Sequence, residues 1–280
     1  SIANTAMAEA WNGAEGEDWA RDWQRYDLGV AAYHRRLLEA AAPEPGERAL
    51  DVGCGNGQVG RDLAARGLRV TGVDLSGPMI ARGTELAAGN PDVELVVGDA
   101  QVHPFPDEAF DLVVSRFGAM FFADRPAAFG NLARATRPGG RIALVAWQGI
   151  AGNEWLQEIR GALALGRDLP QPPVGAPGPF GLGDAPAACE VLRQAGYGDA
   201  QAEALVEPFW AGRDADDAYA FVSRTGVVRG LLDGLPADQV EQGLAQLRAS
   251  LAAHESEDGV VYGSSAWLFT GTRDAGGSRS

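Results

Sequence analysis

Three glycines at alternate positions, Gly53, Gly55 and Gly57, lie between the short apolar run 49–52 and the amphipathic residues 58–66. This order predicts a strand, a tight turn and a helix. Because glycine has no side chain, a ligand can approach the backbone of the turn and lie near the N-terminus of the helix. The stretch therefore predicts a site for a nucleotide-like ligand.

The glycine stretch fits two cofactor patterns that differ in register. Residues 55–60 match the dinucleotide fingerprint G-x-G-x-x-G, with Asp74 at a suitable distance for a ribose, which would indicate an NAD(P)-dependent oxidoreductase. That register places Asp51 inside a buried strand, where an unpaired carboxylate is unfavourable. In the other register the turn begins at Gly53, and Asp51 ends the strand, free to orient the loop or to face a cation.

Two further acidic residues each close a predicted strand. Asp74 closes the second strand, and its carboxylate can accept hydrogen bonds from both hydroxyls of an adenosyl ribose. Its alternative role is a helix N-cap, which Ser76 already suits. Asp99 closes the third strand, where it can accept a hydrogen bond from an adenine amine or form an Asx-turn. Together with Asp51, these carboxylates would line one rim of a sheet.

The motifs between residues 48 and 147 resemble, in type and order, those of class I S-adenosylmethionine-dependent methyltransferases. The runs that carry this resemblance to quinone-methylating and other small-molecule members are D-x-G-x-G at 51–55, PFPDEAFDLVV at 104–114, and residues 115–122 and 137–140. The resemblance implies S-adenosylmethionine as cofactor and S-adenosylhomocysteine as product. It also implies an enzyme that methylates a small organic acceptor at O, N or C, such as a quinone or a natural product. A non-catalytic S-adenosylmethionine-binding protein is the alternative from another class.

The resemblance also assigns the site residues. The predicted cofactor contacts are Asp51, Gly53, Cys54, Gly55, Gly57, Asp74, Leu75, Met79, Asp99, Ala100, Gln101 and Ser115. The predicted acceptor contacts are Arg116, Phe117, Met120, Phe121, Trp11 and Tyr33. Cys54 is expected to pack within the turn rather than to act as a nucleophile.

A general base is needed only when the acceptor is an unactivated hydroxyl or a protonated amine. The candidate catalytic residues are His103, next to the predicted adenine segment, His254, near the predicted sheet rim, and Arg116. A structural role is the alternative for each histidine. Arg116 could pair with an acidic group of the acceptor or form a structural salt bridge. The sequence has no repeated spacing of metal ligands, so no metal is expected.

The elements that must position these residues alternate along the chain. The predicted strands are 48–52, 69–74, 93–98, 110–115, 141–147, 200–209 and 259–270, and the predicted helices are 58–66, 77–88, 125–136, 153–165, 185–195, 214–232 and 237–253. Such alternation predicts an α/β fold with a parallel sheet and helices on both faces. The resemblance adds a Rossmann-like, seven-stranded, mostly parallel sheet whose last strand is antiparallel.

Four regions are expected. They are an aromatic-rich helical lid or strap at 1–44, a cofactor-binding core at 45–150, a completion of the sheet at 151–273 and a disordered tail at 274–280. The third region carries a helical lid at about 214–253, for which a dimer interface is the competing interpretation. The protein is expected to be a monomer or a homodimer.

The charge and composition of the chain further limit the partners and the location that we expect. The net charge is −15, from 23 arginines and 38 acidic residues, and the chain has no lysine. Such an acidic chain, which also lacks the N/D-P-P-Y sequence of amino-methylating DNA enzymes, is not expected to bind nucleic acid. No apolar stretch is long enough to span a bilayer and no leader is evident, so we expect no membrane partner and a cytoplasmic protein. Two isolated cysteines suggest neither a disulfide framework nor a zinc site.

Overall fold

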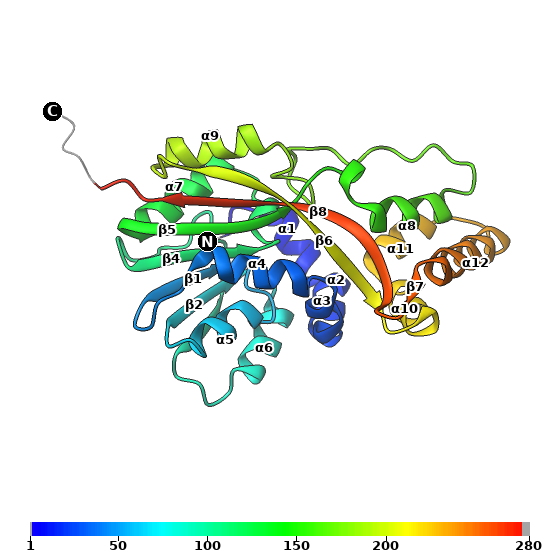
Figure 1. Cartoon of the computed structure of the whole chain (residues 1–280), viewed down its shortest axis with the longest axis horizontal. Coiled ribbons are helices and arrows are strands. Elements are labelled where there is room, and N and C mark those ends of the chain that lie inside the picture. The colour runs from blue at the N-terminus through cyan, green and yellow to red at the C-terminus, as the bar shows by residue number, and fades with distance from the viewer. Residues whose placement is uncertain (1, 276–280) are drawn as a thin grey trace.

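A mixed eight-stranded sheet forms the centre of the computed structural model, which describes residues 2–275 (Figure 1). The strands are β1 (Arg48–Val52), β2 (Arg69–Asp74), β3 (Val93–Val97), β4 (Phe110–Arg116), β5 (Thr136–Trp147), β6 (Gln201–Gly212), β7 (Glu255–Ser256) and β8 (Gly259–Thr272). Their order is β3-β2-β1-β4-β5-β8-β6, and β7 pairs with β8. The pairs among β1 to β5 are parallel, whereas β8 is antiparallel to both β5 and β6. The predicted fold class is confirmed, and the short β7 is an addition to it.

Helices cover both faces of the sheet (Figure 1). The helices α4 (Ala31–Ala41), α5 (Gln58–Ala64) and α6 (Gly77–Leu86) lie on one side, and α7 (Arg125–Ala135) and α9 (Ala185–Ala195) lie on the other. This division follows from right-handed crossovers, because the chain moves outward in one direction from β1 to β3 and in the opposite direction from β4 to β5. The carboxyl ends of the parallel strands therefore meet at one rim.

Local sequence explains several helix boundaries. Ser76 caps α6 by accepting a hydrogen bond from the Met79 backbone at 3.3 Å, as its position in the sequence predicted. Asp124 and Asp184 cap α7 and α9 in the same way. Gly196 ends α9 with a φ of +112°, a left-handed conformation that glycine adopts without strain.

Two predicted boundaries were wrong. Residues 137–140, which lie outside the predicted strand 141–147, belong to β5, where the pairing with β4 is irregular between Phe110 and Leu112. Residues 214–232, predicted as one helix, form α10 (Ala215–Val222) and α11 (Gly226–Leu232). The break occurs because Thr225 adopts an extended conformation, with φ −67° and ψ 154°, immediately before α11.

A second, smaller apolar cluster extends the molecule beyond the end of the sheet. It joins α8 (Glu154–Ala164), α10, α11 and α12 (Ala237–Ala253) to the adjoining ends of β6 and β8. The N-terminal helices α1 (Thr5–Asn12), α2 (Ala14–Arg21) and α3 (Trp23–Gly29) lie between this extension and the sheet (Figure 1). Within residues 2–275, no helix combines the length and apolar character that a membrane crossing requires. Residues 276–280 of the predicted disordered tail lie outside the described residues.

Candidate functional site

The glycine loop connects β1 to α5 and begins at Gly53, as predicted. Gly53, Gly55 and Gly57 have φ values of +65°, +52° and +76°. The backbone N–H groups of Gly53 and Cys54 both donate to the Val73 carbonyl, at 2.8 and 3.2 Å. A Cβ atom at Gly53 would lie 2.6 Å from the Gly118 Cα atom, so the loop after β4 touches the glycine loop directly. Both the conformation and this contact require glycine at position 53.

Asp51 is buried beside this loop without a hydrogen-bond partner. Asp51 is 1 % exposed, and neither of its carboxylate oxygens has a hydrogen-bond partner within residues 2–275. Burial raises the pKa of the Asp51 carboxyl to about 7, against the opposing effects of the Arg116 charge and of the nearby Gly60 N–H. An unpartnered buried carboxylate is unfavourable unless a ligand brings a cation or hydrogen-bond donors to it. The site therefore fits a ligand with a cationic group.

The expected position of Asp51 was wrong in one respect. It pairs with Gly72 inside the sheet, and β1 ends one residue later, at Val52. Burial of Asp51 consequently does not separate the two possible registers of the glycine motif. The position of the turn does separate the two registers, because the glycine loop begins at Gly53, directly after β1.

The other two acidic residues of the rim are engaged by backbone donors. The Asp74 oxygens accept hydrogen bonds from Gly55 and Ser76, both at 2.8 Å. Desolvation raises the pKa of the Asp74 carboxyl, while these N–H donors oppose the rise. Asp74 thereby links the glycine loop to the start of α6. Asp74 ends β2 and Asp99 follows β3, whereas Asp51 is the last but one residue of the adjacent β1.

Asp99 follows β3 and forms the Asx-turn that was its alternative role. Its Oδ1 accepts a hydrogen bond from the Gln101 backbone at 3.0 Å. Its Oδ2 accepts hydrogen bonds from the backbone of Ala3 and Asn4, both at 2.8 Å. The N-terminal segment thus reaches the predicted adenine end of the rim.

The remaining predicted cofactor contacts lie around the same rim. Ser115 is fully buried; its Oγ donates to the Val52 carbonyl at 2.7 Å and accepts from Ala119 at 3.0 Å. Met79, Cys54, Ala100 and Gln101 are buried, and the Leu75 carbonyl accepts a hydrogen bond from Asn12. Burial raises the pKa of the Cys54 thiol well above its ordinary value, which opposes formation of a nucleophilic thiolate.

Arg116 lies at the end of β4 in a network of side chains from the N-terminal helices and α5. It pairs with Asp27 at 2.6 Å and donates to the Gln58 side chain and to His34 Nδ1, the latter at 3.0 Å. His34 Nε2 lies 2.7 Å from Asp62 Oδ2. Arg116 carries no acceptor lone pair, so it is the donor in its contact with His34 Nδ1. The structural salt bridge considered for Arg116 is therefore present.

Sequence reasoning missed the partners of Arg116. These partners are Asp27 of α3, His34 of α4 and Gln58 of α5, and no spacing motif links them to β4. His34 in turn contacts Asp62 of α5. Asp27 is 8 % exposed, and its second oxygen, Oδ2, has no partner within residues 2–275. The network thus brings another unpartnered carboxylate oxygen to the Arg116 side of the site.

Replacing Arg116 with alanine is expected to destabilise the protein by about 3 kcal/mol, because it leaves Asp27 as an uncompensated buried charge. Chemical denaturation of the wild type and the variant measures this change. The double variant Asp27→Asn/Arg116→Met is the control, since it removes both charges and should recover most of the loss. A single variant as stable as the wild type would contradict the role of this pair.

The predicted acceptor residues separate into two aromatic groups. In the first, Phe117 has a left-handed φ of +57° and stacks on Trp147 at 4.1 Å. Tyr33 packs edge-on against both rings; it is fully buried and its hydroxyl lies 2.8 Å from Ser264 Oγ. Tyr33 is therefore part of the core in this structure.

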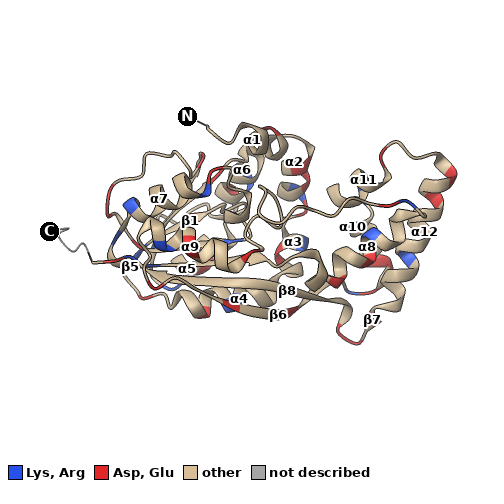
Figure 2. Cartoon of the chain, turned by 90° about the horizontal axis from the view of Figure 1, so that it is seen from above, with Lys and Arg blue, Asp and Glu red and all other residues tan. Residues whose placement is uncertain are grey.

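The second group joins the N-terminal segment to the rim and to the helical extension. Trp11 packs edge-on against Phe121 at 5.4 Å and against Trp19 at 5.6 Å. Trp19 stacks on Tyr26 at 3.6 Å, and Tyr26 meets Phe221 of α10 at 5.1 Å. Figure 2 shows α1 and α2 beside α6, with α10 and α12 farther out. The N-terminal helices, rather than α10 to α12, make the contacts with the glycine loop and the adjoining strand ends.

The two candidate catalytic histidines lie apart from each other and from Arg116. The His103 ring packs 4.6 Å from Phe105 after β3. His254 directly follows α12 in the helical extension, where its ring lies 4.1 Å from the Tyr262 ring and Nδ1 lies 2.8 Å from the Ser250 carbonyl. Within the described residues the structure does not gather the three candidates into one catalytic cluster.

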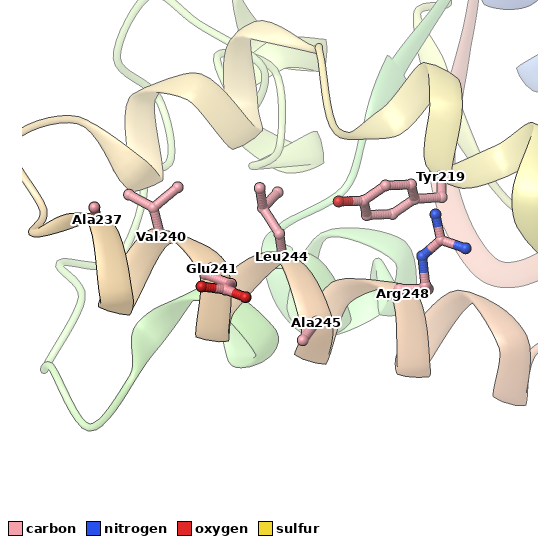
Figure 3. Close-up of a pocket in the computed structure, with 7 residues that line it drawn as sticks. All are labelled: Tyr219, Ala237, Val240, Glu241, Leu244, Ala245 and Arg248. Carbon is pink, nitrogen blue, oxygen red and sulfur yellow. The ribbon is translucent and has the colours of Figure 1, made fainter.

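A groove of about 410 Å³ is lined by Tyr219 of α10 and by residues of α12, and it lies away from the glycine loop. Figure 3 shows Val240 and Leu244 pointing toward the facing segment, and Arg248 beside Tyr219. The Arg248 guanidinium lies 4.2 Å from the centre of the Tyr219 ring. None of the predicted site residues lines this groove.

The sequence of the core is similar to those of known methyltransferases. Residues 50–144 match the family described as "Methyltransferase domain". Malonyl-[acyl-carrier protein] O-methyltransferase of Serratia marcescens is 37% identical over 143 residues, which cover 51% of this chain and 52% of the relative. Demethylmenaquinone methyltransferase of Beutenbergia cavernae is 39% identical over 127 residues, which cover 42% of this chain and 52% of the relative. The chain thus spans about half the length of these curated relatives.

A solved structure, phosphoethanolamine N-methyltransferase 2 of Haemonchus contortus in complex with S-adenosyl-L-methionine, shares the fold. Its TM-score is 0.59 at 20% identity, and the alignment covers 99% of this chain and 61% of that chain. The resemblance predicted from residues 48–147 is confirmed by these findings.

Proposed function

We propose that this chain, whose residues 50–144 match the family described as "Methyltransferase domain", transfers a methyl group from S-adenosylmethionine to a small organic acceptor. The observation that carries the proposal is the buried, unpartnered carboxylate of Asp51 beside a glycine loop that begins at Gly53. When bound, S-adenosylmethionine supplies a methyl group on a sulfonium, and its transfer leaves S-adenosylhomocysteine.

Each residue of the rim has a proposed role. Asp51 and the glycine loop hold the methionine part, Asp74 binds the ribose hydroxyls, and Asp99 with Ala100 reads the adenine. Leu75 and Met79 supply apolar faces for the adenine ring. Asp51 and Asp27 both have carboxylate oxygens without a partner within the described residues, which suits a ligand with positive groups.

The acceptor is proposed to lie beyond the end of β4, against the segment from Ser115 to Phe122 and the N-terminal aromatic residues. Phe117 and Phe121 offer apolar surface there, together with Trp11. Residues 1–44 act as a lid over the rim, and the helices of 214–253 tune acceptor choice through their contacts with Arg25 and Tyr26 of this lid. The chain contributes mainly by positioning the reactants and excluding water. Quinone-like or natural-product acceptors and a cytoplasmic location complete the proposal.

Isothermal titration calorimetry tests the cofactor. We expect micromolar binding of S-adenosylmethionine and S-adenosylhomocysteine and no binding of NADH. Binding of NADH without S-adenosylmethionine would favour the oxidoreductase alternative. An acceptor screen that reports S-adenosylhomocysteine distinguishes an enzyme from a non-catalytic binder, since only an enzyme forms methylated product.

Asp74→Ala is expected to lower S-adenosylmethionine affinity at least tenfold, because it removes hydrogen-bond acceptors for the ribose and releases the Gly55 N–H. Calorimetry measures the affinity, and far-ultraviolet circular dichroism verifies that the fold survives. Asp168→Ala, at an exposed position outside the rim, is the matched control and should bind like the wild type. Unchanged affinity in Asp74→Ala would place the ribose elsewhere.

A further inference from the structure

The carboxylate proposed to read the adenine is already occupied by the N-terminal segment. Asp99 is 2 % exposed, and its Oδ2 accepts the backbone N–H groups of both Ala3 and Asn4 at 2.8 Å. Its Oδ1 accepts the Gln101 N–H at 3.0 Å. A carboxylate oxygen has about two acceptor positions, so the amides of Ala3 and Asn4 fill both positions of Oδ2.

The same segment is anchored at further points along the rim. We call residues 3–19 the strap. The Asn4 side chain donates to the Phe121 carbonyl at 2.9 Å, and Asn12 bridges the Leu75 carbonyl and the Gly77 N–H, both at 2.9 Å. The Trp19 carbonyl accepts a hydrogen bond from Asn56 of the glycine loop at 3.1 Å. The strap therefore crosses the rim above the glycine loop, the end of β2 and the loop after β4 (Figure 2).

We propose that the strap and the adenosyl group compete for Asp99, so that the strap gates the cofactor site. The amides of Ala3 and Asn4 must leave Oδ2 before the adenine amine is bound there. These contacts are strong for backbone hydrogen bonds, because the acceptor is a charged group. The inference rests on the proposed function, since it requires an adenosyl ligand at Asp99.

Competition has a quantitative consequence. The apparent affinity for an adenosyl ligand is reduced by the fraction of molecules in which the strap has released Asp99. Weakening the Asp99 contact alone should therefore tighten ligand binding, although the substituted residue touches no predicted cofactor contact other than Asp99. A strap that served only to clamp the ligand would give the opposite result.

Ala3→Pro is the selective test, because proline lacks the N–H that Ala3 donates to Asp99. Calorimetry with S-adenosylhomocysteine should show about tenfold tighter binding, the effect of losing one hydrogen bond to a charged group. Thr5→Pro is the matched control: Thr5 is the first residue of α1, where proline is well tolerated, and both amides to Asp99 remain. Its affinity for S-adenosylhomocysteine should be within about twofold of that of the wild type, since this substitution removes no hydrogen bond to Asp99.

Amide hydrogen exchange of the wild type gives an independent readout. Addition of S-adenosylhomocysteine should speed exchange at the Ala3 and Asn4 amides, because they lose their acceptor. Slower exchange at these amides, or unchanged or weaker binding in Ala3→Pro, would overturn the inference while leaving the proposed function intact. If S-adenosylhomocysteine binds neither the wild type nor any variant, the proposed function fails, and the inference fails with it.

Discussion

Replacing Asp51 with asparagine is expected to make the ligand-free protein more resistant to unfolding at neutral pH while weakening S-adenosylmethionine binding at least tenfold. Burial raises the pKa of the Asp51 carboxyl from 3.8 to about 7. The folded state therefore holds a proton that the unfolded state has already released at intermediate pH. The wild type should lose stability as pH rises from about 4 to about 7, by about 4 kcal/mol in all from this group.

Asparagine removes this pH dependence because it does not ionise. The difference in free energy of unfolding between Asp51→Asn and the wild type should be small near pH 4 and widen in favour of the variant up to pH 8. Denaturant titrations at several pH values measure the difference, and calorimetry with S-adenosylmethionine measures the loss of binding. A difference that stays constant with pH would show that Asp51 is not kept as an unpartnered buried acid.

Gly53→Ala is expected to abolish measurable S-adenosylhomocysteine binding and to destabilise the fold by about 3 kcal/mol. A left-handed alanine costs about 1–2 kcal/mol. In addition, its Cβ would lie 2.6 Å from the Gly118 Cα atom, which forces the glycine loop and the loop after β4 apart. The expected loss of stability therefore exceeds that caused by a left-handed alanine in an open position.

Gly89→Ala supplies the matched control. Gly89 has a φ of +83°, but no atom lies within 4 Å of the position of an added Cβ. Its substitution should cost only the backbone strain, about 1 kcal/mol, and leave ligand binding unchanged. Denaturation and calorimetry of both variants provide the comparison. Equal effects of the two substitutions would mean that contact between Gly53 and Gly118 has no role in the site.

Asp51→Asn and Gly53→Ala are both expected to weaken ligand binding, but they are expected to change stability in opposite directions. Asp51 is unfavourable for the ligand-free fold, whereas Gly53 is required by it. A residue kept despite its cost to stability is characteristic of a functional site. Opposite stability changes with a shared loss of binding would therefore distinguish ligand recognition at this loop from general damage to the fold.

Several features follow from the sequence alone because they depend on neighbouring residues. Alternating strands and helices predict the parallel sheet, Ser76 predicts the start of α6, and Gly196 predicts the end of α9. The glycine loop begins where Gly53 permits a left-handed backbone next to an apolar strand. Periodicity, capping and backbone freedom act over a few residues, so they can be recognised in order along the chain.

Other features depend on which distant segments meet. The sequence by itself determined the ordered motifs that resemble those of methyltransferases, the position of the glycine turn, and Asp74 and Asp99 at or after the ends of their strands. Only the tertiary structure decided that Asp51 is buried without a partner, that Arg116 pairs with Asp27, and that the N-terminal backbone holds Asp99. The physical reason is that burial and long-range hydrogen bonds are set by packing between segments far apart in the chain, which no local pattern of residues records.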